Sequence, residues 1–281
     1  MRDIILMDGA TGTQLWDKAA ARGYEKCPVW RYNIEHPEIV EELEREYIAA
    51  GSRIILTNTF EANAFTVPRQ TDYTVAEVVA AAAGIAKKAA EGTGVKVVLD
   101  IGPLAAMLEP WGELGADRAT EIFREIMDAG AAAGVDGIAL ETFLDVEMLK
   151  IALIQAKTYG LPVYCSMTFD GSGRTLMGNT PEQIAEELEP LEPAAIGMNC
   201  SVGPVQALGV IKRFAEATEL PLFFKPNAGL AVRKGDVEES EYDAKTFAED
   251  VEPALEYVTY LGSCCGSSPE YIAELAKLIR K

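Results

Sequence analysis

Short apolar runs alternate with amphipathic helical stretches along the whole chain, and this alternation restricts the possible fold more than any other feature. The apolar runs are continuous, as expected for strands that are buried on both faces of a parallel sheet. Eight strand–helix pairs predict the α/β class and a (β/α)8 TIM barrel, with a doubly wound open sheet as the alternative. The predicted strands are Ile4–Met7, Arg53–Thr57, Lys96–Leu99, Gly137–Leu140, Val163–Thr168, Ala195–Met198, Leu222–Lys225 and Tyr257–Leu261.

The helical stretches between these strands are rich in Ala and Glu. Pro37 and Gly51 flank the first of them, which is the usual placement of proline at a helix start and glycine at a helix end. The predicted helices are Glu38–Ala50, Val75–Glu91, Asp117–Ala133, Asp145–Tyr159, Pro181–Leu188, Val205–Ala217, Ala244–Ala254 and Pro269–Ile279. Because the alternation has neither a break in composition nor a Pro/Ser-rich linker, we expect residues 1–281 to form a single barrel domain.

The charge balance excludes two classes of partner. The chain carries 44 acidic and 25 basic side chains, a net charge of −19. We therefore expect binding neither to nucleic acid nor to anionic membrane surfaces, since both select patches of Lys and Arg. No run approaches the roughly 20 apolar residues that span a bilayer. The N-terminus has too short an apolar run before Asp8 for a signal peptide, so the expected compartment is the cytoplasm.

Polar, glycine-rich or cysteine-bearing segments follow nearly every predicted strand. In a barrel the functional site lies at the carboxyl ends of the strands, so these segments are expected to surround it. They are Asp8–Thr13, Thr57–Phe60, Asp100–Pro103, Glu141-Thr142, Asp170–Arg174, Asn199–Ser201, Pro226–Gly229 and Gly262–Gly266.

Three of the five cysteines lie in these segments. Cys200 follows the sixth strand, and Cys264 and Cys265 follow the eighth, so their side chains can converge at the barrel mouth. Three thiolates suit a zinc ion that keeps one position open, provided that Gly262 and Gly266 allow a sharp turn. Two alternatives remain, namely ordinary buried thiols and a strained disulfide between the adjacent cysteines. The other two cysteines, Cys27 and Cys165, are expected to be buried bystanders.

A site of three thiolates favours one kind of chemistry. The chain has a single histidine, His36, which we expect in a loop before a helix, so a histidine-based triad is disfavoured. Three thiolates reduce the Lewis acidity of a metal and make it a poor source of hydroxide. Such a site can still capture a further thiol as an electron-rich thiolate. The cysteines therefore indicate alkylation of a substrate thiol.

These segments resemble the homocysteine S-methyltransferase family over essentially the whole chain. The resemblance is carried by Asp8–Thr13, Thr57–Phe60, Asn199-Cys200 and Gly262-Ser263-Cys264-Cys265-Gly266. Two further segments, Ser172–Leu176 and Pro226–Leu230, are most similar to the homocysteine-binding module of cobalamin-dependent methionine synthase.

The resemblance implies a (β/α)8 barrel with one zinc ion on Cys200, Cys264 and Cys265, and with the homocysteine sulfur on that zinc. It also implies which residues bind the rest of the substrate. Asp8 and Glu141 hold the ammonium group, and backbone amides at Gly9 and Ala10 hold the carboxylate. Asn58 is expected to be a further substrate-binding residue. Carboxylates suit a cation and N–H groups suit an anion. From the residues alone, Asp8 could instead be a turn former and Glu141 a solvated loop charge.

Two departures from the family pattern affect the predicted function. Ser263 stands where the family more often has glycine, and the chain ends at Lys281, one helix after the cysteines. We therefore expect no folate- or cobalamin-binding module, and expect the methyl donor to be a methyl-corrinoid on a separate protein. The alternatives are a small soluble donor such as S-methylmethionine, or a non-catalytic module that binds zinc and homocysteine.

Overall fold

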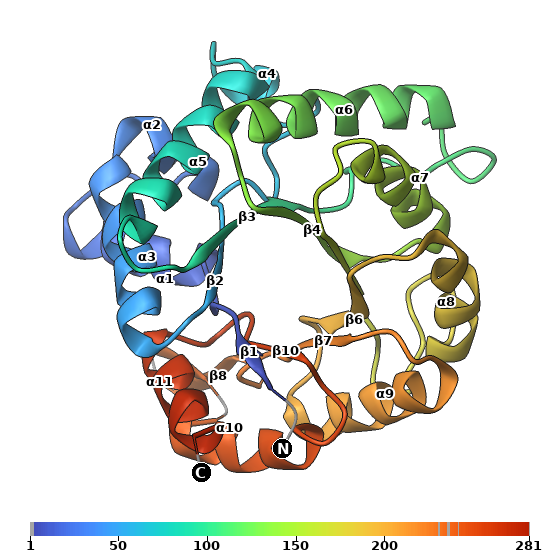
Figure 1. Cartoon of the computed structure of the whole chain (residues 1–281). Helices are drawn as coiled ribbons and strands as arrows, with labels where there is room; N and C mark the ends of the chain where they lie inside the picture. The colour runs from blue at the N-terminus through green and yellow to red at the C-terminus, as the bar shows by residue number, and fades with distance from the viewer. Residues whose placement is uncertain (1–2, 230, 235–236, 241, 281) are drawn as a thin grey trace.

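Eight parallel strands form a nearly closed barrel at the centre of the protein (Figure 1). The computed structural model describes residues 3–229, 231–234, 237–240 and 242–280. The strands follow one another in the sheet in the order β1-β10-β7-β6-β5-β4-β3-β2. Their bounds are β1 Ile5–Leu6, β2 Ile54–Leu56, β3 Lys96–Ile101, β4 Gly137–Phe143, β5 Val163–Met167, β6 Ala195–Asn199, β7 Leu222–Lys225 and β10 Tyr260–Leu261. All eight predicted strands are confirmed, and the fold is the (β/α)8 TIM barrel.

The first and second strands of the chain, β1 and β2, lie at the two ends of this sheet order. The Arg53 backbone N–H donates to the Leu6 carbonyl over 2.7 Å, and the Leu56 N–H donates to the Asp8 side chain over 2.6 Å. Ser52 Oγ also donates to the Met7 carbonyl over 3.1 Å. Contacts from the end of β1 and from the two residues after it therefore help to close the barrel and fix the position of Asp8.

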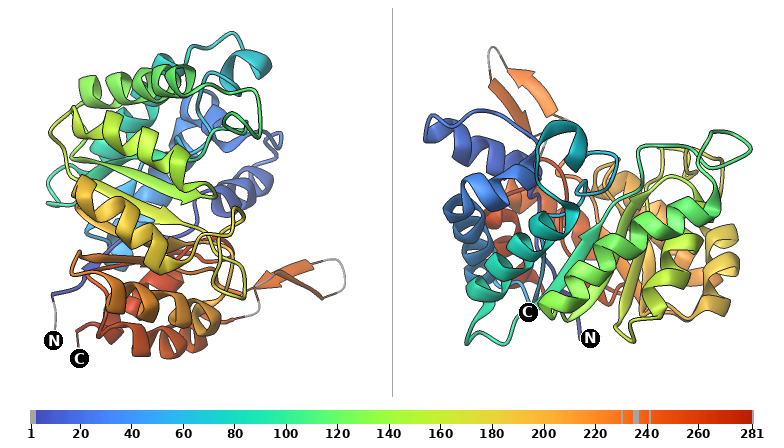
Figure 2. Two further views of the ribbon diagram at one scale, coloured as in Figure 1. Left: turned by 90° about the vertical axis from the view of Figure 1, so that its right-hand side faces the viewer. Right: turned by 90° about the horizontal axis from the view of Figure 1, so that it is seen from above.

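Eight helices form a ring outside the strands (Figures 1 and 2). Thr74 and Thr180 cap two of them through capping boxes, as their sequences favour. Each helix confirms a predicted one, with ends that differ by at most three residues. Their bounds are α3 Pro37–Ala50, α5 Val75–Ala90, α6 Ala116–Ala133, α7 Val146–Lys157, α8 Pro181–Leu188, α9 Pro204–Ala217, α10 Ala244–Val251 and α11 Pro269–Leu278.

The sequence did not predict several short elements in the connections. Three of them are helices, namely α1 (Gly12–Ala21), α2 (Tyr32–Glu35) and α4 (Val67–Gln70). Strands β8 (Ala231–Lys234) and β9 (Val237–Ser240) pair antiparallel and project from the barrel (Figure 2). The remaining short elements are 3-10 turns at Val29–Arg31, Glu189–Leu191 and Glu252–Ala254. Leu230, the last residue of one family-like segment, lies outside the described residues.

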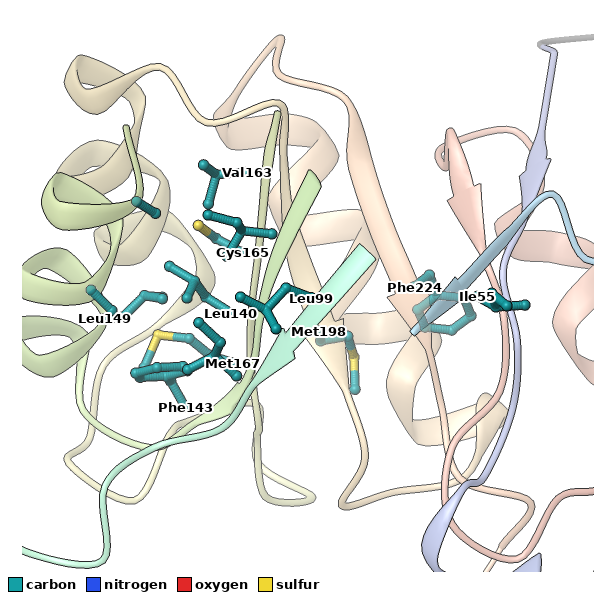
Figure 3. Close-up of a cluster of buried hydrophobic side chains, with 14 of the residues drawn as sticks. Ile55, Leu99, Leu140, Phe143, Leu149, Val163, Cys165, Met167, Met198 and Phe224 are labelled. Carbon is teal, nitrogen blue, oxygen red and sulfur yellow. The ribbon is translucent and has the colours of Figure 1, made fainter. Parts of the chain in front are cut away.

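Residues of each strand alternate between two buried layers. Ile55, Leu99 and Phe224 face outward and join the core between strands and helices, part of which Figure 3 shows. Leu56 and Phe223 belong instead to a separate cluster inside the barrel. Because side chains alternate along a strand, a residue two positions after an inward one also points inward. This register determines which polar side chains reach the barrel mouth.

Candidate active site

Three cysteines converge at the carboxyl ends of two strands, as the sequence predicted. Cys200 follows β6, and Cys264 and Cys265 follow β10. Their three sulfur atoms all lie within 4.8 Å of one another, and 3.8 Å separates Cys200 Sγ from Cys265 Sγ. Two sulfurs bound to a tetrahedral zinc at about 2.3 Å would be about 3.8 Å apart, so this donor set fits the ion. Both adjacent cysteines are free thiols, so the structure lacks a strained disulfide between them.

The backbone at the first of these cysteines is in an uncommon conformation. Cys200 and Ser201 both have positive φ angles, 62° and 64°, and Thr142 at the end of β4 has a φ of 64°. Asn199 connects these segments: its Oδ1 accepts from the Thr142 N–H and from Ser166 Oγ, each over 2.8 Å, and its Nδ2 donates to Thr142 Oγ1 over 2.7 Å. Strained positions of this kind concentrate at functional sites. Asn199 thus joins the ends of three strands beneath the cysteine cluster.

The three thiols influence one another strongly. Hydrogen bonds from Cys264 and Cys265 lower the pKa of Cys200 to about 3. The same hydrogen bond to Cys200 raises the pKa of Cys265 to about 11, and the pKa of Cys264 rises well above its usual range. The cluster alone therefore stabilises one thiolate and two thiols. A metal ion that binds all three sulfurs must displace the remaining protons.

A cavity of about 300 Å³ lies beside the sulfur atoms. Its walls include the aromatic side chains Trp16, Trp30 and Phe60. Seven of the eight site residues predicted from the sequence line it: Gly9, Ala10, Asn58, Glu141, Cys200, Cys264 and Cys265. The eighth, Asp8, is buried but is not among the lining residues.

Asp8 is fully engaged within the protein. Its Oδ1 accepts a hydrogen bond from Lys225 Nζ over 2.9 Å, and its Oδ2 accepts one from the Leu56 N–H. The side chains of Lys225 and Asp8 are 2% and 3% exposed, so this is a buried ion pair. The structure thus gives Asp8 a partner that the sequence did not indicate.

Gly9 and Ala10 pack closely against the loop that carries the adjacent cysteines. The Ala10 N–H donates to Ser267 Oγ over 3.1 Å, so one amide predicted for the substrate carboxylate already has a partner. A Cβ at Gly9 would lie 2.7 Å from Ser263 Oγ, which excludes a larger residue without movement. Ser263 itself is fully buried and donates to Ser267 Oγ over 2.8 Å, so its hydroxyl fits the turn.

Asn58 lines the cavity through a structural network. Its Nδ2 donates to the Val29 carbonyl over 2.7 Å and to Asn33 Oδ1 over 2.9 Å. Asn33 Nδ2 donates in return to the Asn58 carbonyl over 2.8 Å. Asn58 therefore holds the segment after α1 against the end of β2, and its predicted role in substrate binding stays a prediction.

Two buried charged residues of the cavity wall, Asp100 on β3 and Lys225 on β7, were not among the eight predicted site residues. Val98 and Phe223 belong to the inner apolar cluster, and Asp100 and Lys225 follow them by two residues. Both side chains therefore point into the barrel, above that cluster. Glu141 on β4 lies in the cavity wall for the same reason. The alternation within each strand carried this signal, but only a known register could have revealed it.

These buried charges perturb one another. Burial, reinforced by Glu141, raises the pKa of Asp100 well above its usual range. Burial also raises the pKa of Glu141, which the Lys225 ammonium group partly opposes. Although burial disfavours the charged form of Lys225, Asp8 and Glu141 together raise its pKa. Lys225 is accordingly a permanent internal cation beside three buried carboxyl groups.

Other residues named from the sequence lie apart from the cavity. Cys165 is fully buried on β5, in the layer between strands and helices shown in Figure 3. Cys27 is buried in the connection after α1. His36 lies between α2 and α3, as expected, and stacks on Tyr24 with 3.7 Å between ring centroids. Within the described part of the chain, no helix is both long and apolar enough to cross a membrane.

Comparisons with known proteins agree with this arrangement. The sequence profile of the family described as homocysteine S-methyltransferase matches residues 5–279. A methionine synthase from Mycobacterium leprae is 28% identical over 302 residues, which cover 99% of this chain and 24% of that protein. This chain therefore spans about a quarter of that relative's length.

Solved structures show the same fold. The metallated form of the homocysteine methyltransferase MmuM from Escherichia coli superposes with a TM-score of 0.79 at 20% identity, covering 98% of this chain and 96% of that chain. Its apo form gives a TM-score of 0.74 at 21% identity, with coverage of 99% and 96%.

Proposed function

Because the chain belongs to the homocysteine S-methyltransferase family, we propose that it transfers a methyl group to the thiol of homocysteine, giving methionine. The observation that carries this proposal is the cysteine cluster, whose three sulfur atoms lie within 4.8 Å of one another at the wall of the cavity. Buried carboxyl groups line the same cavity, as a zwitterionic amino acid requires. We propose that one barrel domain, residues 1–281, contains the whole acceptor site.

We propose that Cys200, Cys264 and Cys265 hold a zinc ion. When bound there, zinc would supply a Lewis acid that lowers the pKa of a substrate thiol while leaving the sulfur nucleophilic. Free thiols of this kind persist in a reducing compartment, and all five cysteines of the chain are free, so we assign the protein to the cytoplasm.

The chain's own contribution to the reaction is positioning. The substrate thiol gives up its proton to water, and its sulfur attacks the methyl carbon in line with the bond to the donor. The sulfur–carbon bond forms as the methyl–donor bond breaks, and that electron pair stays with the donor. Holding the sulfur at one point of a walled cavity replaces a random encounter by an oriented one. Trp16, Trp30 and Phe60 form part of those walls.

For the donor we propose a methyl-corrinoid carried by a separate protein. The methionine synthase relative is about four times as long as this chain, which covers 24% of it. Large apolar side chains are also exposed in the segments that follow β3, β4, β5 and β6, the last of them in the first turn of α9. These are Met107, Trp111, Leu144, Leu176 and Val205. Exposed apolar groups around a functional site favour a macromolecular partner, and a corrinoid protein must reach this face to deliver its methyl group.

The test measures bound zinc and methionine formation with a panel of donors. The proposal expects turnover with a methylated corrinoid protein or methylcobalamin. Turnover with S-methylmethionine or a methylated amine alone would support the small-donor alternative. Homocysteine binding without turnover on any donor would support a non-catalytic module.

The cysteine variants test the zinc site separately. Cys200→Ala and Cys265→Ala are expected to lose zinc and activity, whereas Cys27→Ala, whose side chain lies outside the cavity, is the matched control. Full activity of either site variant would exclude the role proposed for zinc.

A further inference from the structure

Two buried serines flank the pair of adjacent cysteines. Ser263 and Ser267 are both fully buried, and Ser263 Oγ donates a hydrogen bond to Ser267 Oγ over 2.8 Å. Ser267 Oγ in turn donates to the Cys264 carbonyl over 2.7 Å and accepts from the Ala10 N–H over 3.1 Å. A hydroxyl group has one proton to donate and two lone pairs that can accept. Every hydrogen-bonding position of Ser267 Oγ is therefore used, and Ser263 supplies one of its two donors.

The turn that carries Cys264 and Cys265 is held from two sides. On one side lies the connection after β7, where the Pro226 carbonyl accepts from the Cys264 N–H over 2.9 Å. In the same connection the Ala228 N–H donates to the Cys265 carbonyl over 3.0 Å. On the other side lies the connection after β1, and the two serines link it to the Cys264 carbonyl. The serine hydroxyl groups therefore support the side of the turn that faces β1.

The connection after β1 approaches these hydroxyl groups very closely. A Cβ at Gly9 would lie 2.7 Å from Ser263 Oγ and 2.8 Å from Ser267 Oγ, too short for an unstrained contact. Tyr47 Oη donates to the carbonyl of the following residue, Ala10, over 2.7 Å and holds the connection in place. The connection and the cysteine turn therefore pack as one unit, with the two serine hydroxyl groups between them.

We propose that Ser263 is a positioning residue of the zinc site, which together with Ser267 keeps the cysteine turn in its metal-binding conformation before the metal binds. The inference rests on the proposed function and deepens it, because it concerns the zinc site on which that function depends. Ligands that are already in place need no further ordering when the ion arrives. If the turn spends time in other conformations, the zinc affinity falls by the fraction of protein that is no longer competent to bind.

Ser263 is also a departure from the family pattern, which more often has glycine at this position. Ser263 is not one of the described residues that have a positive φ angle, so the position does not require glycine. Glycine here would leave Ser267 Oγ with one donor fewer and would give the backbone before Cys264 additional freedom. The serine therefore adds a hydrogen bond to the turn and restricts its backbone.

The test measures zinc affinity by competition with a chelator. Ser267→Ala removes three hydrogen bonds and should weaken zinc binding about tenfold or more. Ser263→Ala removes one of them and should weaken zinc binding about threefold or more. In the Ser267→Ala background, Ser263→Ala should have little further effect, because Ser263 acts through Ser267. Ser263→Gly should bind zinc no more tightly than Ser263→Ala, and it provides a second variant in case the first does not fold.

Hydrogen exchange of the metal-free protein measures the conformation of the turn itself. In Ser263→Ala the amides of residues 263–267 should exchange faster than in the wild type, and zinc should restore their protection. Ser52→Ala is the matched control: Ser52 is also fully buried, but its hydroxyl donates to the Met7 carbonyl rather than to the cysteine turn. This control should lower the stability by a similar amount while leaving zinc affinity and exchange of the turn unchanged.

Three outcomes would overturn the inference. Zinc affinities of Ser263→Ala and Ser263→Gly that equal that of the wild type would refute it while leaving the proposed zinc site intact. A loss of affinity in Ser52→Ala as large as in Ser263→Ala would do the same, since it would show that general destabilisation is the cause. A wild type that binds no zinc would refute the inference together with the proposed function.

Discussion

Replacing Lys225 with methionine should destabilise the protein in a strongly pH-dependent way. The substitution keeps the length of the side chain but removes an ammonium group that lies 2.9 Å from Asp8 Oδ1 and 3.5 Å from Glu141 Oε2. The Lys225 side chain is 2% exposed, so water cannot compensate for the loss. Removing one partner of a buried ion pair costs about 3–5 kcal/mol, and we expect a loss in this range at pH 7.

The pH dependence follows from the neighbouring carboxyl groups. Burial already raises the pKa of Asp100 and of Glu141 in the folded protein. A carboxyl group with a raised folded pKa leaves stability intact below its unfolded pKa and reduces it as the pH rises toward the folded pKa. Without Lys225 these pKa values rise further, and each affected group costs up to about 1.4 kcal/mol per pH unit. The penalty should therefore be smaller at pH 5 than at pH 7.

Urea unfolding of both proteins at pH 5, 6, 7 and 8 measures this penalty directly. Lys245→Met is the matched control, because the Lys245 side chain is 80% exposed and its ion pair with Glu249 lies on the surface. The control should change the free energy of unfolding by less than about 1 kcal/mol. A loss below about 1 kcal/mol for Lys225→Met at pH 7, or one that is equal at pH 5 and pH 7, would contradict the electrostatic account of the cavity.

Three further substitutions test other parts of the structure. Glu44→Gln should raise the free energy of unfolding by about 1–2 kcal/mol at pH 7 and leave it unchanged near pH 4. Both buried Glu44 oxygens lack hydrogen-bond partners in the described part of the chain, and burial raises the pKa of Glu44 well above its usual range. A gain in stability that persists at pH 4 would contradict this cause. Asn199→Ala should weaken zinc binding about tenfold or more, measured by competition with a chelator. The Asn199 side chain accepts hydrogen bonds from Thr142 and Ser166, and its Nδ2 lies 3.9 Å from Cys264 Sγ. An unchanged zinc affinity would show that Asn199 supports the fold and not the metal site. Leu176→Lys, at a side chain that is 77% exposed, should raise KM for a methylated corrinoid protein without changing the rate with free methylcobalamin; equal effects on both donors would argue against docking at this loop.

The strands and the cysteine cluster could be predicted because both depend on local sequence and on topology. Continuous apolar runs indicate strands in a parallel sheet, and the carboxyl ends of such strands meet at one end of the barrel. Cys200 and Cys265 could therefore be brought together although they are far apart in the chain. Their sulfur atoms lie 3.8 Å apart in the structure.

The charged half of the site could not be predicted in the same way. The third predicted strand ended at Leu99, whereas β3 continues to Ile101, so Asp100 was assigned to a loop rather than to an inward position. Lys225 was recognised as the end of a strand, but its partner Asp8 is 217 residues away in sequence. Such a pairing follows from the register of the closed barrel. The structure adds an ion pair between Asp8 and Lys225, and the substrate contact that the family resemblance implies for Asp8 stays a prediction.

The rate of methionine formation as a function of added zinc tests the central claim most directly. Metal-free protein would be titrated with zinc in the presence of homocysteine and a methylated corrinoid protein. The account predicts that the rate rises in proportion to zinc until each chain holds one ion, and that Cys200→Ala stays inactive throughout. An equal rate in metal-free protein, or a normal titration of Cys200→Ala, would contradict the claim that the three cysteines activate the substrate thiol through zinc.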